Sequence, residues 1–276
     1  MVSDAQEEQM GIGVDQQIRH EYRVAEPSDP ITAWAAELVA PLATASAEFR
    51  DPSGFNDYKI AVLVDDDLVN AFAAPGGYTY ITTGLILQAS SCGEIAGVLG
   101  HELGHVTERH GVKKLEEAFA ISIITEWFLG EGLAADAALT IYSFLLSTEF
   151  SQEDEAEADS VGLQIAFAAG YNPYGLVDFF QRLLDLTGES SAFAQFFSSH
   201  PATEDRIADT SAEIQRRYGD QVVKGQTQTY DCVGTRLSFE QAQQHAASGA
   251  IAVIPGTGEG PPAAAAAAAT DQGDEG

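Results

Sequence analysis

Short stretches of β-branched and aromatic residues, separated by polar or glycine-containing turns, mark the region between residues 58 and 82. Runs of this kind, bounded by turn residues, are typical of β-strands. We expect three strands, at residues 58–64, 68–73 and 78–82. Because the connections between them are short, the pattern predicts a small antiparallel meander.

Most of the remaining chain repeats its apolar residues at the three- and four-residue spacing of one helix face. Asp29 followed by Pro30 marks one helix start, with a polar cap before a proline at the first helical position. Further helices are expected at residues 91–111, 115–129, 133–146, 151–169, 174–186 and 201–218. The chain is therefore expected to have an α+β fold that is mostly helical, with about three strands.

The length of 276 residues suits one domain with a full core and additional terminal segments. We expect an N-terminal helical segment over 1–50, packed on a main domain over 51–220, and a C-terminal extension over 221–254. The last segment, 255–276, contains seven consecutive alanines and an acidic end. Low-complexity sequence of this kind cannot bury a core, so we expect it to be disordered.

The charge balance narrows the choice of partners. The chain has 42 acidic residues against 13 lysines and arginines, a formal net charge of −29. A surface this acidic repels nucleic acid and anionic lipid, so nucleic acid is not an expected partner. The apolar helices over 115–146 would allow membrane association, but each apolar run is too short for a transmembrane span.

Residues 101–105 read His-Glu-Leu-Gly-His, an HExxH sequence inside one of the expected helices. Residues four apart lie on one face of a helix, so the imidazoles of His101 and His105 can hold one Zn²⁺. Glu102 lies close enough to take a proton from water bound to the metal, which makes it a candidate general base. The alternative is a chance pair of histidines, and a third ligand would decide between the two.

The helix that carries HExxH does not supply that third ligand. The longer zincin motif needs glycine at 108 and histidine at 111, where this chain has Glu108 and Gly111. His110 is nine residues from His101 and would point to the opposite side of a continuous helix. A carboxylate from a later helix is the remaining option.

The acidic segment 153–159 contains such carboxylates, although it could also be a solvated acidic face. Glu155 and Asp159 are four apart and share a helix face, and alanines at 156 and 158 would let this helix approach another closely. One carboxylate could bind zinc while the other accepts a hydrogen bond from a ligating imidazole.

Five short motifs occur in a recognisable order: Asn70-Ala71-Phe72, Thr82-Thr83-Gly84-Leu85, HExxH, Glu155-Ala156-Glu157-Ala158-Asp159 and His200-Pro201. In this order they resemble the gluzincin family of zinc metallopeptidases that includes the CaaX prenyl proteases, HtpX, BepA and LoiP. The resemblance covers residues 3–218 and implies a zincin-like fold in which the small sheet packs on the HExxH helix. It also implies one Zn²⁺ per chain.

The resemblance implies roles for individual residues. Glu155 would be the third zinc ligand, and Asp159 would orient a zinc-binding histidine. His200 would lie over the metal and either cap it in a resting state or stabilise the tetrahedral intermediate, with support from Arg206. The alternative for His200 is that it only marks the start of a helix, because proline follows it.

Substrate binding is also implied by the resemblance. The expected third strand, Tyr78, Thr79, Tyr80, Ile81 and Thr82, resembles the family's edge strand, on which a peptide adds as a further β-strand. Asn70 would help to hold that peptide. The implied function is a zinc-dependent endopeptidase that cleaves extended protein segments in envelope protein quality control. The alternatives are a metal-bound but latent or inactive chaperone-like module, and a helical protein with a fortuitous HExxH.

The resemblance to soluble periplasmic members implies an extracytoplasmic protein, periplasmic or membrane-associated, rather than a cytoplasmic one. The first residues have neither a basic nor an apolar leader region, so we expect the leader to be absent from this numbering. The two cysteines, Cys92 and Cys232, do not decide whether the compartment is oxidising or reducing, because they could form one disulfide or remain two free thiols.

Overall fold

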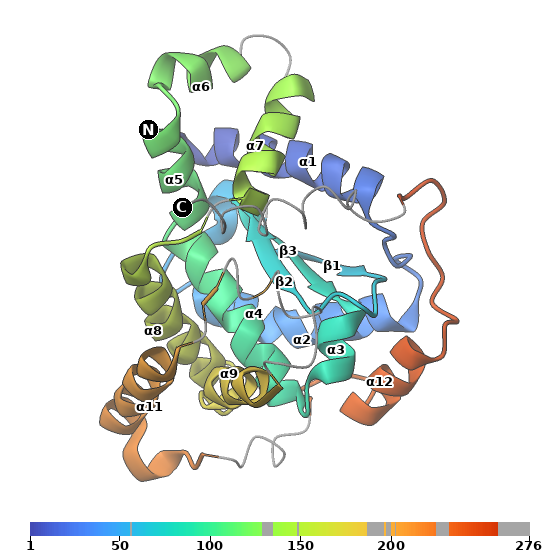
Figure 1. The fold of residues 1–276 in the computed structure, drawn as a ribbon, viewed down its shortest axis with the longest axis vertical. Coiled ribbons are helices and arrows are strands. Elements are labelled where there is room, and N and C mark those ends of the chain that lie inside the picture. Colours follow the sequence, from blue (N-terminus) through green and yellow to red (C-terminus); the bar gives the residue numbers. More distant parts are fainter. Residues whose placement is uncertain are drawn as a thin grey trace, which may run out of the picture.

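A three-stranded sheet surrounded by helices forms the centre of the chain in the computed structural model (Figure 1). The structure describes residues 1–55, 57–128, 135–147, 149–186, 196, 200–201, 203–224 and 232–258. From residue 259 onward, the expected disordered tail lies outside the described residues. The helices are α1 (Asp4–Glu21), α2 (Pro30–Ser46), α3 (Thr83–Gln88), α4 (Cys92–Thr107), α5 (His110–Ala118), α6 (Ile121–Trp127), α7 (Ala135–Ser147), α8 (Gln152–Ala168), α9 (Gly175–Leu186), α11 (Glu204–Tyr218) and α12 (Phe239–Ala247).

The sheet has the order β1-β3-β2, which differs from the expected meander. Strand β1 (Lys59–Leu63) pairs parallel with β3 (Tyr78–Thr82), and β2 (Ala71–Ala74) pairs antiparallel with β3. The expectation of a wholly antiparallel sheet is therefore wrong for β1. The segment between β1 and β2 leaves a gap between these two strands, and β3 fills that gap as the central strand.

Two helix boundaries also differ from the sequence pattern. The helix expected over 91–111 ends at Thr107, where Arg109 adopts a left-handed backbone with φ 60°, and a new helix starts at His110. The helix expected over 115–129 is divided between α5 and α6. In contrast, α2 begins at Pro30 as expected, and the Asp29 side chain accepts a hydrogen bond from the Ile31 amide.

Helix α4 occupies the middle of the fold, where it packs against α8, α9, α2 and β2 (Figure 1). Its contact with α8 is close because small residues face each other. A Cβ built on Gly104 would lie 2.7 Å from the Ala158 carbonyl oxygen, and one on Gly162 would lie 2.7 Å from the His101 nitrogen. Larger side chains at these positions would push the two helices apart. The close packing thus fixes how near a side chain of α8 comes to the HExxH residues.

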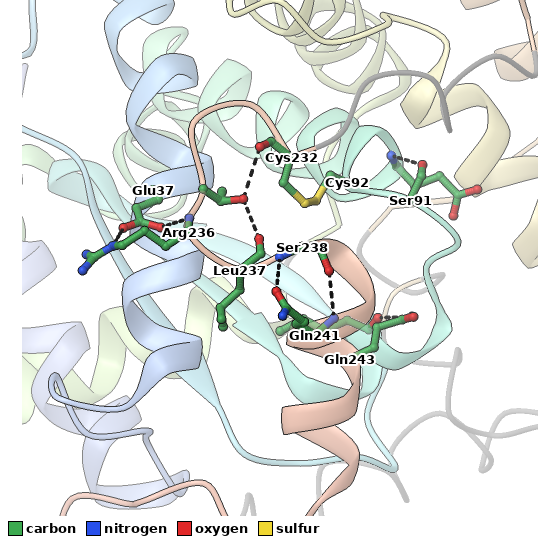
Figure 2. The surroundings of a disulfide bond; sticks show 12 residues. Glu37, Ser91, Cys92, Cys232, Arg236, Leu237, Ser238, Gln241 and Gln243 are labelled. Carbon is green, nitrogen blue, oxygen red and sulfur yellow. Dashed lines mark hydrogen bonds and ion pairs between the residues drawn. A yellow bond between two sulfur atoms is a disulfide. The ribbon is translucent and has the colours of Figure 1, made fainter.

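The C-terminal segment folds back onto the start of α4. A disulfide joins Cys92, the first residue of α4, to Cys232, and it closes a loop with a sequence separation of 140 (Figure 2). Nearby, Arg236 forms an ion pair with Glu37 of α2, and the Gln243 side chain donates hydrogen bonds to carbonyl oxygens at the end of α3 (Figure 2). The disulfide that the sequence left open is thus present, and it ties the HExxH helix to the last described part of the chain.

Among the helices that the structure describes, none combines the length and the hydrophobicity needed to cross a membrane.

Candidate metal centre

His101 and His105 lie one turn apart on α4, and both side chains are buried. Their Nε2 atoms are 3.0 Å from each other, so both imidazoles direct the same ring nitrogen at one point. The α4 helix holds them there, since the Ser91 side chain caps its first turn and α8 and α9 cover its sides. This is the arrangement that a four-residue spacing predicts for two metal ligands.

Glu155 of α8 and His200 complete a cluster of four possible donors that lie within 4.8 Å of one another. The Oε1 atom of Glu155 is 3.2 Å from His105 Nε2 and 2.9 Å from His200 Nδ1. His200 Nδ1 is also 3.2 Å from His101 Nε2. Nitrogen and carboxylate donors that converge on one buried point are the ligand types a divalent metal takes, and a cation between the two histidine Nε2 atoms would let both be unprotonated.

Glu102 faces this cluster from the same helix as His101 and His105, but it is not one of the four donors. One of its oxygens, Oε1, is buried without a hydrogen-bond partner among the described residues, and it lies 3.4 Å from His200 Nε2. Burial raises the pKa of the Glu102 carboxyl, although His200 and His101 partly oppose that shift. The carboxyl also accepts a backbone hydrogen bond from Ala73 of β2. A buried carboxyl with a raised pKa and one unbonded oxygen beside a metal site can accept and release a proton.

Asp159 and Arg206 contact two members of the cluster, His101 and Glu155. Asp159 Oδ1 is 2.8 Å from His101 Nδ1, the ring nitrogen that faces away from the cluster. Arg206 of α11 binds Asp159 with two nitrogens, at 2.5 and 2.7 Å, and its Nη1 is 2.5 Å from Glu155 Oε2. Burial alone would raise the pKa of the Asp159 carboxyl, but hydrogen bonds from Arg206 and His101 hold it below the usual range.

The residues of the cluster differ in the direction in which their pKa values are shifted. Burial would raise the pKa of Glu155, but His200, His101 and His105 lower it well below the usual range, so this carboxyl stays ionised. Burial lowers the pKa of His105 well below its usual value, which favours the neutral imidazole that a metal requires. Burial would lower the pKa of His200 too, but Glu155 and Glu102 raise it overall.

His110 is the residue of this site that sequence reasoning misplaced. It is fully buried, and its Nδ1 atom lies 2.9 Å from Nδ1 of His105. The expectation that it points away from the site is wrong, because α4 ends at Thr107 and the backbone reverses at Arg109. The sequence offers only a weak signal for this break, since Arg109 has no obvious tendency to adopt a left-handed conformation.

The substrate strand expected at Tyr78–Thr82 needs a correction. This segment is β3, the central strand, and its backbone pairs with β1 on one side and with β2 on the other. A peptide therefore cannot add to Tyr78, Thr79, Tyr80, Ile81 and Thr82, because their ladder groups are already used. Strand β2 is an edge of the sheet, and it packs more extensively against α4 than β3 does.

Asn70 precedes β2 and lines a small cavity together with Glu102, His105 and His200. Its side chain is buried, and its Oδ1 atom has no hydrogen-bond partner among the described residues. Phe72, Ala73 and Ala74 of β2 line the same cavity. A second cavity, of about 440 Å³, opens on the other side of Glu155 between α8 and α11. Unfilled space thus flanks the cluster on both sides.

Two imidazoles, a carboxylate from a second helix and a nearby glutamate that is not one of these donors form the set of groups that HExxH metallopeptidases use. Residues 31–214 match the sequence profile of peptidase family M48. The matched range covers more than half of the chain, and the chain belongs to peptidase family M48.

The chain is also similar to curated proteins that are named as proteases. The beta-barrel assembly-enhancing protease of Escherichia coli (strain K12) is 29% identical over 221 residues, which cover 75% of this chain and 44% of that protein. The metalloprotease LoiP of the same organism is 30% identical over 155 residues, or 54% of this chain and 59% of that protein. The mitochondrial metalloendopeptidase OMA1 of Arabidopsis thaliana is 32% identical over 145 residues, or 52% and 29%. Each match spans less than two thirds of the relative.

Proposed function

We propose that this chain is a zinc-dependent endopeptidase that cleaves extended protein segments in the cell envelope. The observation that carries the proposal is the buried cluster of His101, His105, Glu155 and His200, with the Glu102 carboxyl beside it, whose Oε1 has no hydrogen-bond partner among the described residues. His101, His105 and Glu155 would hold the metal. Three nitrogen and oxygen ligands with a further position open to water or substrate are typical of catalytic zinc.

The bound zinc would polarise the scissile carbonyl and acidify a water molecule. Glu102 takes a proton from the attacking water and later passes it to the leaving amine, which its raised pKa favours. His200, whose pKa is raised by two carboxylates, donates a hydrogen bond to the developing oxyanion. Arg206 is held by Asp159 and Glu155, so it positions these two carboxylates rather than reacting itself.

We propose that the substrate pairs with β2 and not with β3. Among the described residues no strand pairs with the outer edge of β2, which lies beside Asn70, Glu102 and His105. An extended peptide added there would pass the cluster. The apolar residues that line the same cavity, among them Ile18 of α1 and Leu145 of α7, would then contact the substrate side chains. This arrangement supports cleavage of extended segments rather than folded ones.

His200 also supports the alternative of a latent enzyme. Its Nδ1 atom lies within hydrogen-bonding distance of both His101 and Glu155, so it can occupy the position that substrate or water needs. Movement of His200 away from the cluster would then precede turnover. A latent enzyme of this kind would still bind zinc, whereas a helical protein with a fortuitous HExxH would not.

Metal content tests the proposal. We expect one zinc per chain in the purified wild type by mass spectrometry, and less than a tenth of that in Glu155→Ala, because the variant keeps only two strong ligands. His200→Ala is the matched control, since it removes a neighbouring donor of the same cluster but leaves the three proposed ligands, and it should retain the metal. A wild-type protein that carries no metal after purification without chelator would contradict the proposal.

The envelope location rests on the disulfide and on the relatives. Disulfides persist in oxidising compartments and are rare in the cytosol. We therefore expect Cys92 and Cys232 to resist labelling by a thiol reagent in intact cells of the source organism, and to react only after reduction. Labelling without reduction would place the chain in a reducing compartment and would contradict the proposed envelope location.

A further inference from the structure

A histidine that the proposed mechanism leaves unused lies directly behind one of the proposed ligands. His110 is fully buried at the first turn of α5, and its Nδ1 atom is 2.9 Å from Nδ1 of His105. On its other side, Nε2 of His110 is 3.1 Å from Oε2 of Glu157, whose side chain is 50% exposed. A line of hydrogen-bonding groups therefore runs from His105 through His110 to the surface.

Only one placement of the protons in this line is compatible with metal binding. The Nε2 atom of His105 faces His101 and Glu155 at 3.0 and 3.2 Å, so it is the nitrogen that would bind the metal and must carry no proton. The proton of neutral His105 is then on Nδ1. Because this atom faces Nδ1 of His110, it must donate to it, and His110 must accept there.

The proton of neutral His110 is consequently on Nε2. This atom faces the carboxylate of Glu157 at 3.1 Å and, further away at 3.7 Å, that of Asp154. An ionised carboxylate accepts hydrogen bonds and cannot donate one. The opposite tautomer of His110 would place two N–H groups against each other at His105 and leave Glu157 facing a lone pair. Glu157 therefore selects the one tautomer of His110 that leaves His105 ready for the metal.

We propose that His110 and Glu157 are positioning residues that hold His105 as an Nε2 metal ligand. The inference rests on the proposed zinc site. It parallels the contact between Asp159 and His101, where a carboxylate accepts the outward N–H of the other ligand directly. Here a second imidazole is inserted between ligand and carboxylate. Ring nitrogens behind a metal ligand commonly have such partners, and their removal typically weakens metal binding about 10- to 100-fold.

Zinc affinity, measured by competition with a chromogenic chelator, tests the proposal. His110→Leu removes the acceptor, and we expect its zinc dissociation constant to rise about 10- to 100-fold. His110→Asn places an amide oxygen near the former Nδ1 atom, so it should restore most of the affinity. Glu157→Leu leaves His110 but removes its acceptor, and its dissociation constant should rise about 10-fold. The control is Glu153→Gln, at an exposed position of α8, the helix that also carries Glu157. It should bind zinc like the wild type.

Two further measurements separate positioning from structural support. Thermal unfolding of the metal-free Glu157→Leu protein should match that of the wild type, because this half-exposed residue contributes little to packing. In the zinc-loaded wild type, ¹⁵N NMR of histidine side chains should show His110 protonated at Nε2 and unprotonated at Nδ1. This second reading needs no variant, so it remains decisive if His110→Leu does not fold.

The outcomes distinguish the two proposals. A wild type without zinc affinity removes the metal site and the positioning role together. A wild type that binds zinc, with His110→Leu and Glu157→Leu binding equally well, leaves the endopeptidase proposal intact and overturns the positioning role. A proton found on Nδ1 of His110 in the zinc-loaded protein also overturns it.

Discussion

Replacing Glu102 with glutamine should leave zinc binding unchanged and lower the rate of peptide cleavage about 10²- to 10⁴-fold, which is the usual contribution of a general base or acid. The substitution keeps the size of the side chain and a hydrogen-bonding oxygen, so it should not disturb α4. It removes the ability to take a proton. The rate is measured with an unfolded protein substrate such as casein, and the zinc content by mass spectrometry on the same sample.

Glu108→Gln is the matched control for this experiment. Glu108 ends the same helix and is partly exposed, and it has no contact with the donor cluster in the structure. The control should therefore cleave at the wild-type rate. If Glu102→Gln cleaved casein as fast as the control while holding one zinc per chain, another group would have to carry the proton, and the mechanism proposed above would be wrong.

The HExxH helix could be predicted from the sequence because its geometry is local. His101 and His105 share a helix face whatever the rest of the fold does, and the structure places both Nε2 atoms together. The distance from Glu155 to this pair is not local. It depends on the packing of α8 on α4 through small residues such as Gly104 and Ala158. The alanines of the acidic segment suggested a close approach, but only the family resemblance identified Glu155 as the ligand.

The errors arise where long-range arrangement or a rare backbone conformation decides the structure. Strand order depends on which strands meet after the chain has folded, and short turns between β1, β2 and β3 wrongly favoured a meander. His110 was placed on the wrong side because a left-handed Arg109 carries almost no sequence signal. The disulfide could not be derived either, since the two cysteines are 140 residues apart and nothing local links them.

Arg206→Leu should destabilise the metal-free protein by about 3–5 kcal/mol, the usual cost of removing one partner from a buried ion pair. The guanidinium of Arg206 is 10% exposed and contacts Asp159 and Glu155, whose side chains are 4% and 6% exposed. Without it, two carboxylates stay buried next to each other with less compensating charge. The free energy of unfolding is measured by urea denaturation, on metal-free samples so that zinc binding does not enter the value.

Arg217→Leu is the control on the same helix. Arg217 is 42% exposed and pairs with Glu213 one turn away, so its loss should cost no more than about 1 kcal/mol. Arg206→Lys should lie between the two, because lysine restores a positive charge but not the two-pronged contact with Asp159. Equal stability of Arg206→Leu and Arg217→Leu would mean that the histidines of the cluster already balance the two carboxylates. In that case Arg206 would only orient Asp159, and its removal would alter zinc affinity without altering the fold.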